Sequence, residues 1–212
     1  MMRLRLNTML NINNGFCGGL LGEIQRKATE ERIPIIPRDS VAFLESVTEL
    51  LKPERILEIG CAIGFSAALM LSHMPETGHV ITIDRFDIMI ADAKRNFKLL
   101  GIEKRVTLLE GDALEILTGL DGEFDMIFVD AAKGQYINFL PHCMRLLRGG
   151  GVLLCDDVLQ GGILSGERLA VPRRQRTTYT RMREFLHSIT TMPEMTVSIL
   201  PIGDGMAFCV KK

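Results

Sequence analysis

Short hydrophobic runs alternate with amphipathic stretches through most of the chain. The hydrophobic runs are predicted to be β-strands, at residues 55–59, 79–83, 106–109, 125–129 and 151–155. Helical periodicity fills the intervals, at residues 65–73, 87–100, 113–117 and 136–147. Strands that are apolar at nearly every position and alternate with helices predict a parallel sheet with both faces covered.

The two ends of the chain depart from this alternation. Residues 21–51 have a helical pattern that the prolines of the IPIIP segment (33–37) interrupt, and Asp39-Ser40 offers a cap for a helix over 41–51. Two further strands, at 196–202 and 206–210, flank a Gly-Asp-Gly turn, which predicts an antiparallel hairpin. The prediction is one doubly wound α/β domain, with loosely ordered residues 1–20 and a large loop at 155–178.

Composition limits the classes of function. With 25 basic and 26 acidic residues the net charge is −1, which excludes a globally basic nucleic-acid binder but allows a local basic patch. The uncharged run at 59–72 is too short for a membrane span, which needs ~20 residues. Five widely spaced cysteines without a CxxC pair predict free thiols. We therefore expect a soluble, cytoplasmic protein with no membrane partner.

Acidic residues and a glycine turn follow the first three predicted strands. The turn from Gly60 to Gly64 lacks the GxGxxG spacing, and by itself is only a tight connection. Asp84 ends the second strand and could accept ribose hydroxyls; Asp112 follows the third and could face an adenine amino group. Each acid alone would be read as a helix N-cap. Together, at successive strand ends, they predict an adenosine ligand without phosphates, which suggests S-adenosylmethionine (SAM).

Three more carboxylates follow the fourth and fifth strands: Asp130, Asp156 and Asp157. Clustered acids repel one another without a counter-ion, and oxygen-only ligands suit Mg²⁺ or another hard divalent cation. Lys133, one helical turn after Asp130, is either a base for a substrate hydroxyl, if its pKa is lowered, or a surface lysine paired with an aspartate. The spacing leaves both interpretations open.

The motifs LEIGCAIGFSA, TID, GDA, VDAAKGQY, CDDVL and PIGDGMA resemble the class I SAM-dependent O-methyltransferases of the catechol and caffeoyl-CoA type, over residues 30–212. VDAAKGQY, PIGDG and the Gly-rich then Arg-rich loop look most like the bacterial branch that methylates 5-hydroxyuridine in tRNA. The resemblance implies a Rossmann-like class I methyltransferase fold. Its sheet would have seven mostly parallel strands and a C-terminal antiparallel hairpin. It also implies a homodimer, a methyltransferase domain at 41–212 and an N-terminal lid or helical extension at 1–40.

The resemblance also assigns site residues. The cofactor would be bound by Ile35, Glu58, Gly60, Ser66, Asp84, Asp112, Ala113 and Asp130. Asp130, Asp156 and Asp157 would bind the metal, and Lys133 with Asp130 would be catalytic. Asp157 departs from the asparagine that is usual in the family, and residues 1–20 have no match to it.

Six arginines and no acid occur between residues 168 and 183: Arg168, Arg173, Arg174, Arg176, Arg181 and Arg183. Such a run is either a solvated helix face or a phosphate-binding patch beside the site. We favour a patch that binds tRNA through Arg173, Arg174 and Arg176, with Tyr136 stacking on a splayed base. A small phenol of the catechol or caffeoyl-CoA type is the alternative substrate. A non-catalytic adenosine-binding protein is disfavoured by the complete acid set and Lys133.

Overall fold

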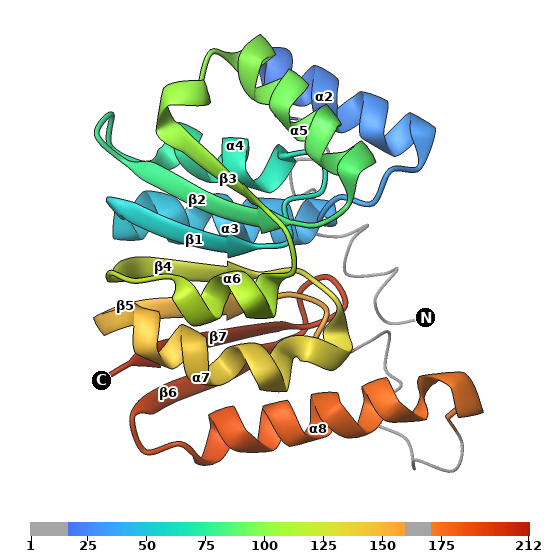
Figure 1. Cartoon of the computed structure of the whole chain (residues 1–212), viewed down its shortest axis with the longest axis vertical. Coiled ribbons are helices and arrows are strands. Elements are labelled where there is room, and N and C mark those ends of the chain that lie inside the picture. Colours follow the sequence, from blue (N-terminus) through green and yellow to red (C-terminus); the bar gives the residue numbers. More distant parts are fainter. Residues whose placement is uncertain (1–16, 160–170) are drawn as a thin grey trace, which may run out of the picture.

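The computed structural model describes residues 17–159 and 171–212 of the chain. Seven strands form one sheet in the order β3-β2-β1-β4-β5-β7-β6 (Figure 1). Their bounds are β1 Arg55–Ile59, β2 His79–Asp84, β3 Val106–Glu110, β4 Phe124–Val129, β5 Leu147–Cys155, β6 Met195–Leu200 and β7 Met206–Lys211. Strands β1 to β5 are parallel, and β7 is antiparallel to both β5 and β6. The predicted mostly parallel sheet with a C-terminal antiparallel hairpin is confirmed.

Helices cover both faces of the sheet. The bounds are α2 Gly19–Glu31, α3 Arg38–Leu51, α4 Phe65–His73, α5 Asp87–Leu100, α6 Ala113–Gly119, α7 Tyr136–Leu146 and α8 Arg176–Thr191, with the short 3-10 helices η1 Glu103–Arg105, η2 Lys133–Gln135 and η5 Arg173–Gln175. One hydrophobic core joins α2, α3, α4 and α5 to the sheet, and a second joins α6, α7 and α8 to its other face. The fold therefore has three layers.

The strands are apolar at consecutive positions because alternate side chains enter different cores. In β1, Ile56 belongs to the core under α2–α5, whereas Leu57 belongs to the core under α6–α8. Met126 and Ile127 divide in the same way in β4. This burial on both sides is the physical reason that the strands read as continuous hydrophobic runs.

Strand β7 lies inside the sheet although it follows the other six strands in the chain. Val210 is paired with Val152 of β5 on one side and with Thr196 of β6 on the other. The hairpin is therefore joined to the parallel strands through its second strand, and β6 forms the edge.

The start of α3 differs from the prediction. The helix begins at Arg38 after Pro37, and no side chain caps it, so the predicted Asp39-Ser40 cap is wrong. Pro37 has a fixed φ and no N–H that would need a partner, and the helix begins directly after it. The Asp39 carboxylate instead accepts from the backbone N–H of Gly203, at 2.9 Å, which ties α3 to the β6–β7 turn. The predicted domain boundary at residue 40 stays a prediction, and α3 runs across it.

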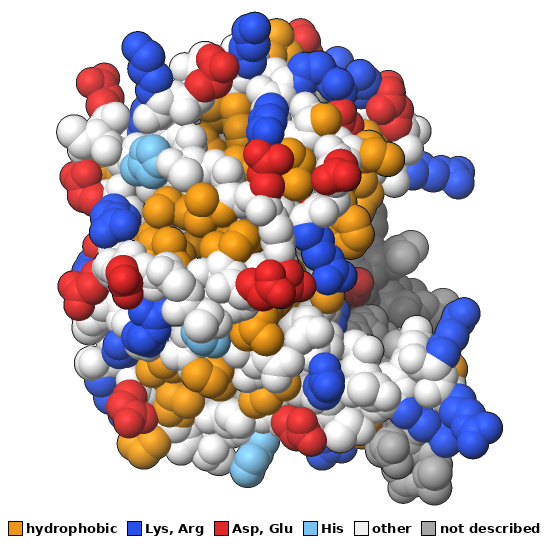
Figure 2. Space-filling model, in the orientation of Figure 1, with side chains coloured by type: hydrophobic (Ala, Val, Ile, Leu, Met, Phe, Trp, Pro, Cys, Tyr) orange, Lys and Arg blue, Asp and Glu red, His pale blue; other side chains and the backbone are white. Residues whose placement is uncertain are grey.

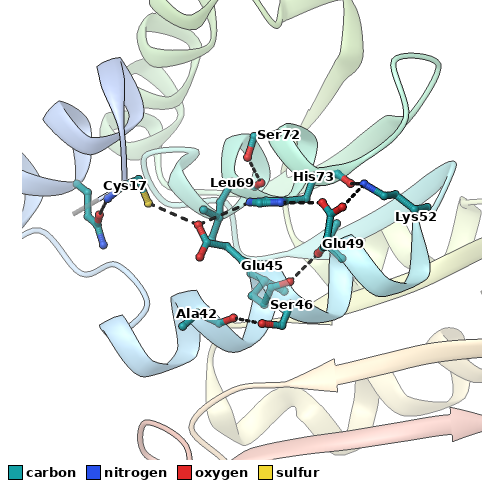
Figure 3. Close-up of polar contacts among 12 residues, drawn as sticks. Cys17, Ala42, Glu45, Ser46, Glu49, Lys52, Leu69, Ser72 and His73 are labelled. Carbon is teal, nitrogen blue, oxygen red and sulfur yellow. Dashed lines mark hydrogen bonds and ion pairs between the residues drawn. The ribbon is translucent and has the colours of Figure 1, made fainter. Parts of the chain in front are cut away.

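A polar network joins α3 to the end of α4 (Figure 3). His73 Nδ1 lies 3.1 Å from Glu49 Oε2, and Lys52 Nζ lies 2.6 Å from Glu49 Oε1. Cys17 Sγ lies 4.0 Å from Glu45 Oε1, and burial, followed by the charge of Glu45, raises the pKa of this thiol. The network fastens two helices outside the cavity described below.

All five cysteines are free thiols. Among the described helices, none has the length and apolar character needed to cross a bilayer.

Candidate active site

A cavity of about 1200 Å³ opens at the carboxyl ends of the parallel strands. Most of the predicted cofactor and metal residues line it: Ile35, Gly60, Ser66, Asp84, Asp112, Ala113, Asp130, Asp156 and Asp157. Two groups of predicted residues do not lie on its wall. Glu58, Lys133 and Tyr136 lie next to residues that do, and Arg173, Arg174 and Arg176 lie further along the chain.

Gly60 is required by the sheet itself. A Cβ at this position would lie 2.0 Å from the backbone oxygen of Asp130, and the φ of Gly60 is +103°. Its N–H donates to the oxygen of Ile83 at 3.0 Å, which continues the β1–β2 hydrogen bonding past the strand end. The turn after β1 therefore lies close against β4, and only glycine fits there.

Asp84 holds the same turn in place. Its Oδ2 accepts from the N–H groups of Cys61 and Ala62, at 3.0 and 2.8 Å. Its Oδ1 accepts from the N–H groups of Arg85 and Phe86, at 2.7 and 3.0 Å. Four backbone donors thus fix this carboxylate on the cavity wall, and its predicted ribose contact stays a prediction.

Asp112 is the N-cap of α6. Its Oδ1 accepts from the N–H of Leu114 at 2.9 Å, and its Oδ2 lies 3.2 Å from Arg85 Nη1. The structure thus bears out the capping role for this residue, and the adenine contact stays a prediction beside it. The ion pair with Arg85 spans the ends of β2 and β3 at the cavity.

Glu58 is a fully buried carboxyl group in β1. The hydroxyl of Thr82 donates to its Oε2, whereas its Oε1 has no hydrogen-bond partner among the described residues. Burial raises its pKa to about 8, an effect that Ser66 and Thr82 oppose and the charges of Asp130 and Asp84 reinforce. An oxygen without a partner in this position can accept a hydrogen bond from a ligand.

Two of the three predicted metal ligands, Asp130 and Asp157, contact Lys133 in the structure. Lys133 Nζ lies 2.8 Å from Asp130 Oδ1 and 3.1 Å from Asp157 Oδ2. Burial lowers the pKa of Lys133, but Tyr136, Asp130 and Asp157 raise it by more, so the pKa lies above that of an ordinary lysine. In this arrangement Lys133 is a protonated partner of the acids, and its role as a base stays a prediction.

Asp156 is the most enclosed of the three acids, with 1% of its surface exposed. Burial raises its pKa to about 7, and the charge of Asp130 adds to the effect. Asp157 has a left-handed backbone, with φ of +59°, and its N–H donates to Asp156 Oδ1 at 2.8 Å. Asparagine adopts this conformation at least as readily as aspartate does, so the backbone accepts either residue.

Tyr136 is not a surface for stacking on a base, and that prediction is wrong. Only 1% of the residue is exposed, and its ring packs edge-on against Phe185, with centroids 5.5 Å apart. Its hydroxyl lies 3.1 Å from the backbone oxygen of Val129 and 3.0 Å from that of Asp156. The tyrosine is turned inward because α7 begins at this residue and its apolar face packs on the sheet.

The arginine run divides into exposed and structural members. Arg173 and Arg174 are exposed on η5, and positively charged side chains gather where α8 begins (Figure 2). Arg176 donates to the oxygen of Val171 at 3.0 Å, and Arg183 to the hydroxyl of Tyr179 at 2.8 Å. Arg181 donates to the oxygen of Gly134, at 3.2 Å, so α8 is fastened to the η2 turn that carries Lys133. Arg168 lies outside the described residues.

Several residues that line the cavity were not predicted from the sequence, and two of them are large, exposed apolar side chains. Phe86 and Ile88 line the cavity at the start of α5, and 61% and 76% of their surfaces are exposed. Large apolar side chains directly after the strand-end acid Asp84 were the signal that could have identified them. Asp204, in the PIGDG turn, also lines the cavity.

The sheet order and the cavity at its carboxyl edge are those of a Rossmann-like methyltransferase. The SAH-bound methyltransferase PaMTH1 from Podospora anserina has a similar structure, with a TM-score of 0.86 and 29% identity, covering 100% of this chain and 95% of that one. The model of the O-methyltransferase family matches residues 19–212. The chain belongs to this family and is a SAM-dependent O-methyltransferase of the caffeoyl-CoA and catechol type.

Two curated relatives agree with this assignment. A catechol O-methyltransferase from Niastella koreensis is 30% identical over 176 residues, which cover 80% of this chain and 79% of the relative. A caffeoyl-CoA O-methyltransferase from Populus kitakamiensis is 28% identical over 180 residues, covering 82% of this chain and 77% of the relative.

Proposed function

We propose that this methyltransferase acts with a divalent cation and that its acceptor is the 5-hydroxyl group of 5-hydroxyuridine in tRNA. The observation that carries the acceptor is the pair of exposed arginines, Arg173 and Arg174, beside a helix that Arg181 fastens to the Lys133 turn. A polyanion bound there would lie at the start of α8, the helix that contacts the turn after β4. The homodimer is part of the same proposal and is checked by light scattering.

The cavity supports the assigned cofactor residues. Glu58 Oε1 is a buried acceptor without a partner in the described structure, one residue from the cavity wall at Ile59. The ammonium group of a bound amino acid moiety would satisfy it, so the methionine end of SAM fits beside Glu58, Gly60 and Ser66. Asp84, Asp112, Ala113 and Ile35 line the same cavity; in this proposal the first three would contact the adenosine and Ile35 would cover it from the N-terminal side.

The donor chemistry of the acids fits a hard divalent cation. Asp130, Asp156 and Asp157 offer only oxygen ligands, and their mutual repulsion is one cause of the raised pKa of Asp156. Among the described residues, no group of three or more His, Cys, Asp or Glu side chains is arranged to hold a metal, and Lys133 contacts two of the acids. We infer that Lys133 and the acids rearrange when a cation enters. A bound cation would supply acidity to the acceptor hydroxyl and align it.

The residues of this chain have separable roles in the proposed reaction. Bound SAM would supply the methyl group: the acceptor oxygen would gain a bond to the methyl carbon, and the electron pair of the broken carbon–sulfur bond would return to sulfur to give SAH. The turn from Gly60 to Ala62, held by Asp84, keeps the donor in place. The proton of the acceptor hydroxyl would leave at the acid cluster, and Lys133 is the candidate to receive it after releasing its own proton to solvent.

A small phenol is the second candidate acceptor, because the curated relatives are named for catechol and caffeoyl-CoA substrates. A catechol offers two adjacent oxygens, as 5-hydroxyuracil does with its 5-hydroxyl and O4. The site chemistry therefore suits either acceptor. The exposed arginines favour tRNA, because a small phenol has no phosphates for them to bind.

The decisive experiment follows the label from methyl-labelled SAM. Bulk tRNA containing 5-hydroxyuridine and a panel of catechols are compared, each with and without EDTA. Label in tRNA that EDTA abolishes supports the proposal. Label in catechols alone makes the small phenol the acceptor, label that persists in EDTA refutes the cation, and label in neither refutes both acceptors.

A further inference from the structure

The hydroxyl of Tyr136 is a junction between the two strand ends that carry the acids. It lies within hydrogen-bond distance of the backbone oxygen of Val129, the last residue of β4, and of Asp156, which follows β5. A buried phenol that forms no hydrogen bond is costly. Here the hydroxyl is bonded to the backbone at the place where the hydrogen bonding of the sheet ends, since the N–H of Asp156 also donates to Val129, at 3.0 Å.

The same hydroxyl accepts from Lys133 Nζ at 3.2 Å. An ammonium group has three donors, and the three contacts of Lys133 are Asp130, Asp157 and Tyr136. Among the described contacts of this lysine, Tyr136 is therefore the neutral partner and orients the ammonium group. The other side of the short η2 turn is held by Arg181 through the oxygen of Gly134.

We propose that Tyr136 is a positioning residue, whose hydroxyl sets the placement of Lys133 and of the Asp130 and Asp156 strand ends relative to one another. It touches neither cofactor nor acceptor, because its side chain is enclosed by α7, α8 and the sheet. Its effect is to hold the acid cluster in one geometry. The expected effect of Tyr136 on kcat rests on the proposed function. The expected effect on the order of the two strand ends does not.

The chain offers matched variants for a test. Tyr136→Phe removes one oxygen and keeps the ring contact with Phe185. The only other tyrosine of the sequence, Tyr179, is also buried, and Tyr179→Phe removes the same atom away from the acids. Phe185→Leu changes the ring packing and keeps the Tyr136 hydroxyl group itself. Thermal unfolding and calorimetry with SAH show that each variant is folded and binds cofactor.

The first measurement is hydrogen exchange of the ligand-free protein, which needs no substrate. The amides of Gln135 and Asp156 are bonded within the region that Tyr136 holds, to Ala132 and Val129. We expect peptides covering residues 130–136 and 155–158 to exchange at least ~5-fold faster in Tyr136→Phe than in Tyr179→Phe. Equal exchange in the two variants overturns the proposal, whatever the enzyme methylates.

The second measurement separates kcat from KM with the acceptor that the wild type uses. We expect Tyr136→Phe to lower kcat at least ~10-fold, with KM and the affinity for SAH within about twofold of wild type. Tyr179→Phe and Phe185→Leu should keep the wild-type kcat. A kcat for Tyr136→Phe within twofold of wild type overturns the positioning role, as does an equal loss in Phe185→Leu. A wild type that methylates no acceptor refutes the proposed function, and hydrogen exchange then decides the junction alone.

Discussion

Glu58 places a carboxyl group where water does not reach, directly behind the cavity wall. Its pKa of about 8 in the folded chain lies above the value near 4.5 of an exposed glutamate, chiefly because of burial. Between these two values the folded protein keeps a proton that the unfolded chain has released. The free energy of unfolding therefore decreases as the pH rises from 4.5 to 8. Above pH 8 the ionisation of Glu58 no longer changes it.

Glu58→Gln tests this dependence, because the amide has the same shape and does not titrate. We expect the variant without cofactor to gain stability over wild type as the pH rises through this window, and to differ little from it at pH 4.5. Urea denaturation at four values between pH 4.5 and 8 measures the difference. A difference that stays constant over the window would show that Glu58 is ionised throughout.

At Asp157 the backbone conformation and the ligand chemistry both predict that asparagine is tolerated. Asparagine fits the left-handed conformation and keeps an oxygen ligand, so Asp157→Asn should retain activity within about threefold of wild type. Asp156→Asn should lower activity about 100-fold or more, since this acid lies deepest in the cluster. Rates with saturating Mg²⁺ compare the two variants, and the reverse order of effects would mean that the ligands are assigned wrongly.

Residue positions at strand ends were predictable from the sequence, but their partners were not. Asp84 and Asp112 lie on the cavity as expected, because parallel strands place their carboxyl ends on one edge. The four backbone donors to Asp84 come from two turns whose shape no periodicity reveals. Tyr136 was misjudged for the same reason: a residue at the junction of a 3-10 helix and an α-helix can face either way until α8 is packed on it.

At the scale of elements, the turn between β1 and α4 depends on a single residue, Gly60. Gly60→Ala would place a methyl group against the Asp130 backbone in a conformation that alanine rarely adopts. We expect a loss of about 2–4 kcal/mol in the free energy of unfolding. Gly119→Ala is the control, because nothing lies within 4 Å of a Cβ added in α6, and a change of at most ~1 kcal/mol is expected there. Chemical denaturation measures both, and equal losses would contradict the close approach of β1 and β4.

The order and type of the elements followed from the hydrophobic pattern, whereas several boundaries did not. β5 begins at Leu147, four residues before the predicted start, because its glycines Gly149–Gly151 hid the strand signal. The start of α3 was misplaced because Asp39 has a tertiary partner, Gly203, 164 positions away. The sequence alone does not show whether an aspartate near a helix start caps that helix or binds a distant backbone group.

For the whole molecule, the distribution of charge matters more than its sum. The net charge is −1, yet Arg173 and Arg174 are exposed together at the start of α8. If this patch binds tRNA phosphates, replacing Arg173, Arg174 and Arg176 with alanine should weaken tRNA binding. The slope of log affinity against log salt should also flatten by up to ~3, about one unit per lost contact.

Two controls accompany the triple variant. SAH affinity should stay at the wild-type value, because the cofactor side of the cavity uses other strand ends. Binding is measured by fluorescence anisotropy between about 50 and about 300 mM salt, a sixfold range that shortens the screening length about 2.4-fold. A triple variant with the wild-type slope would show that the arginines are a solvated face and would favour the small phenol.

The interior position of β7 bears on how the chain can be assembled. Until β7 has been synthesised, β5 presents an open edge of unpaired backbone groups and β6 has no strand to join. The acid at Asp156 belongs to that same half of the sheet. A nascent chain on the ribosome can thus form the β1–β4 part of the sheet early. Its β5 edge stays open to strand exchange and aggregation until β7 pairs with it.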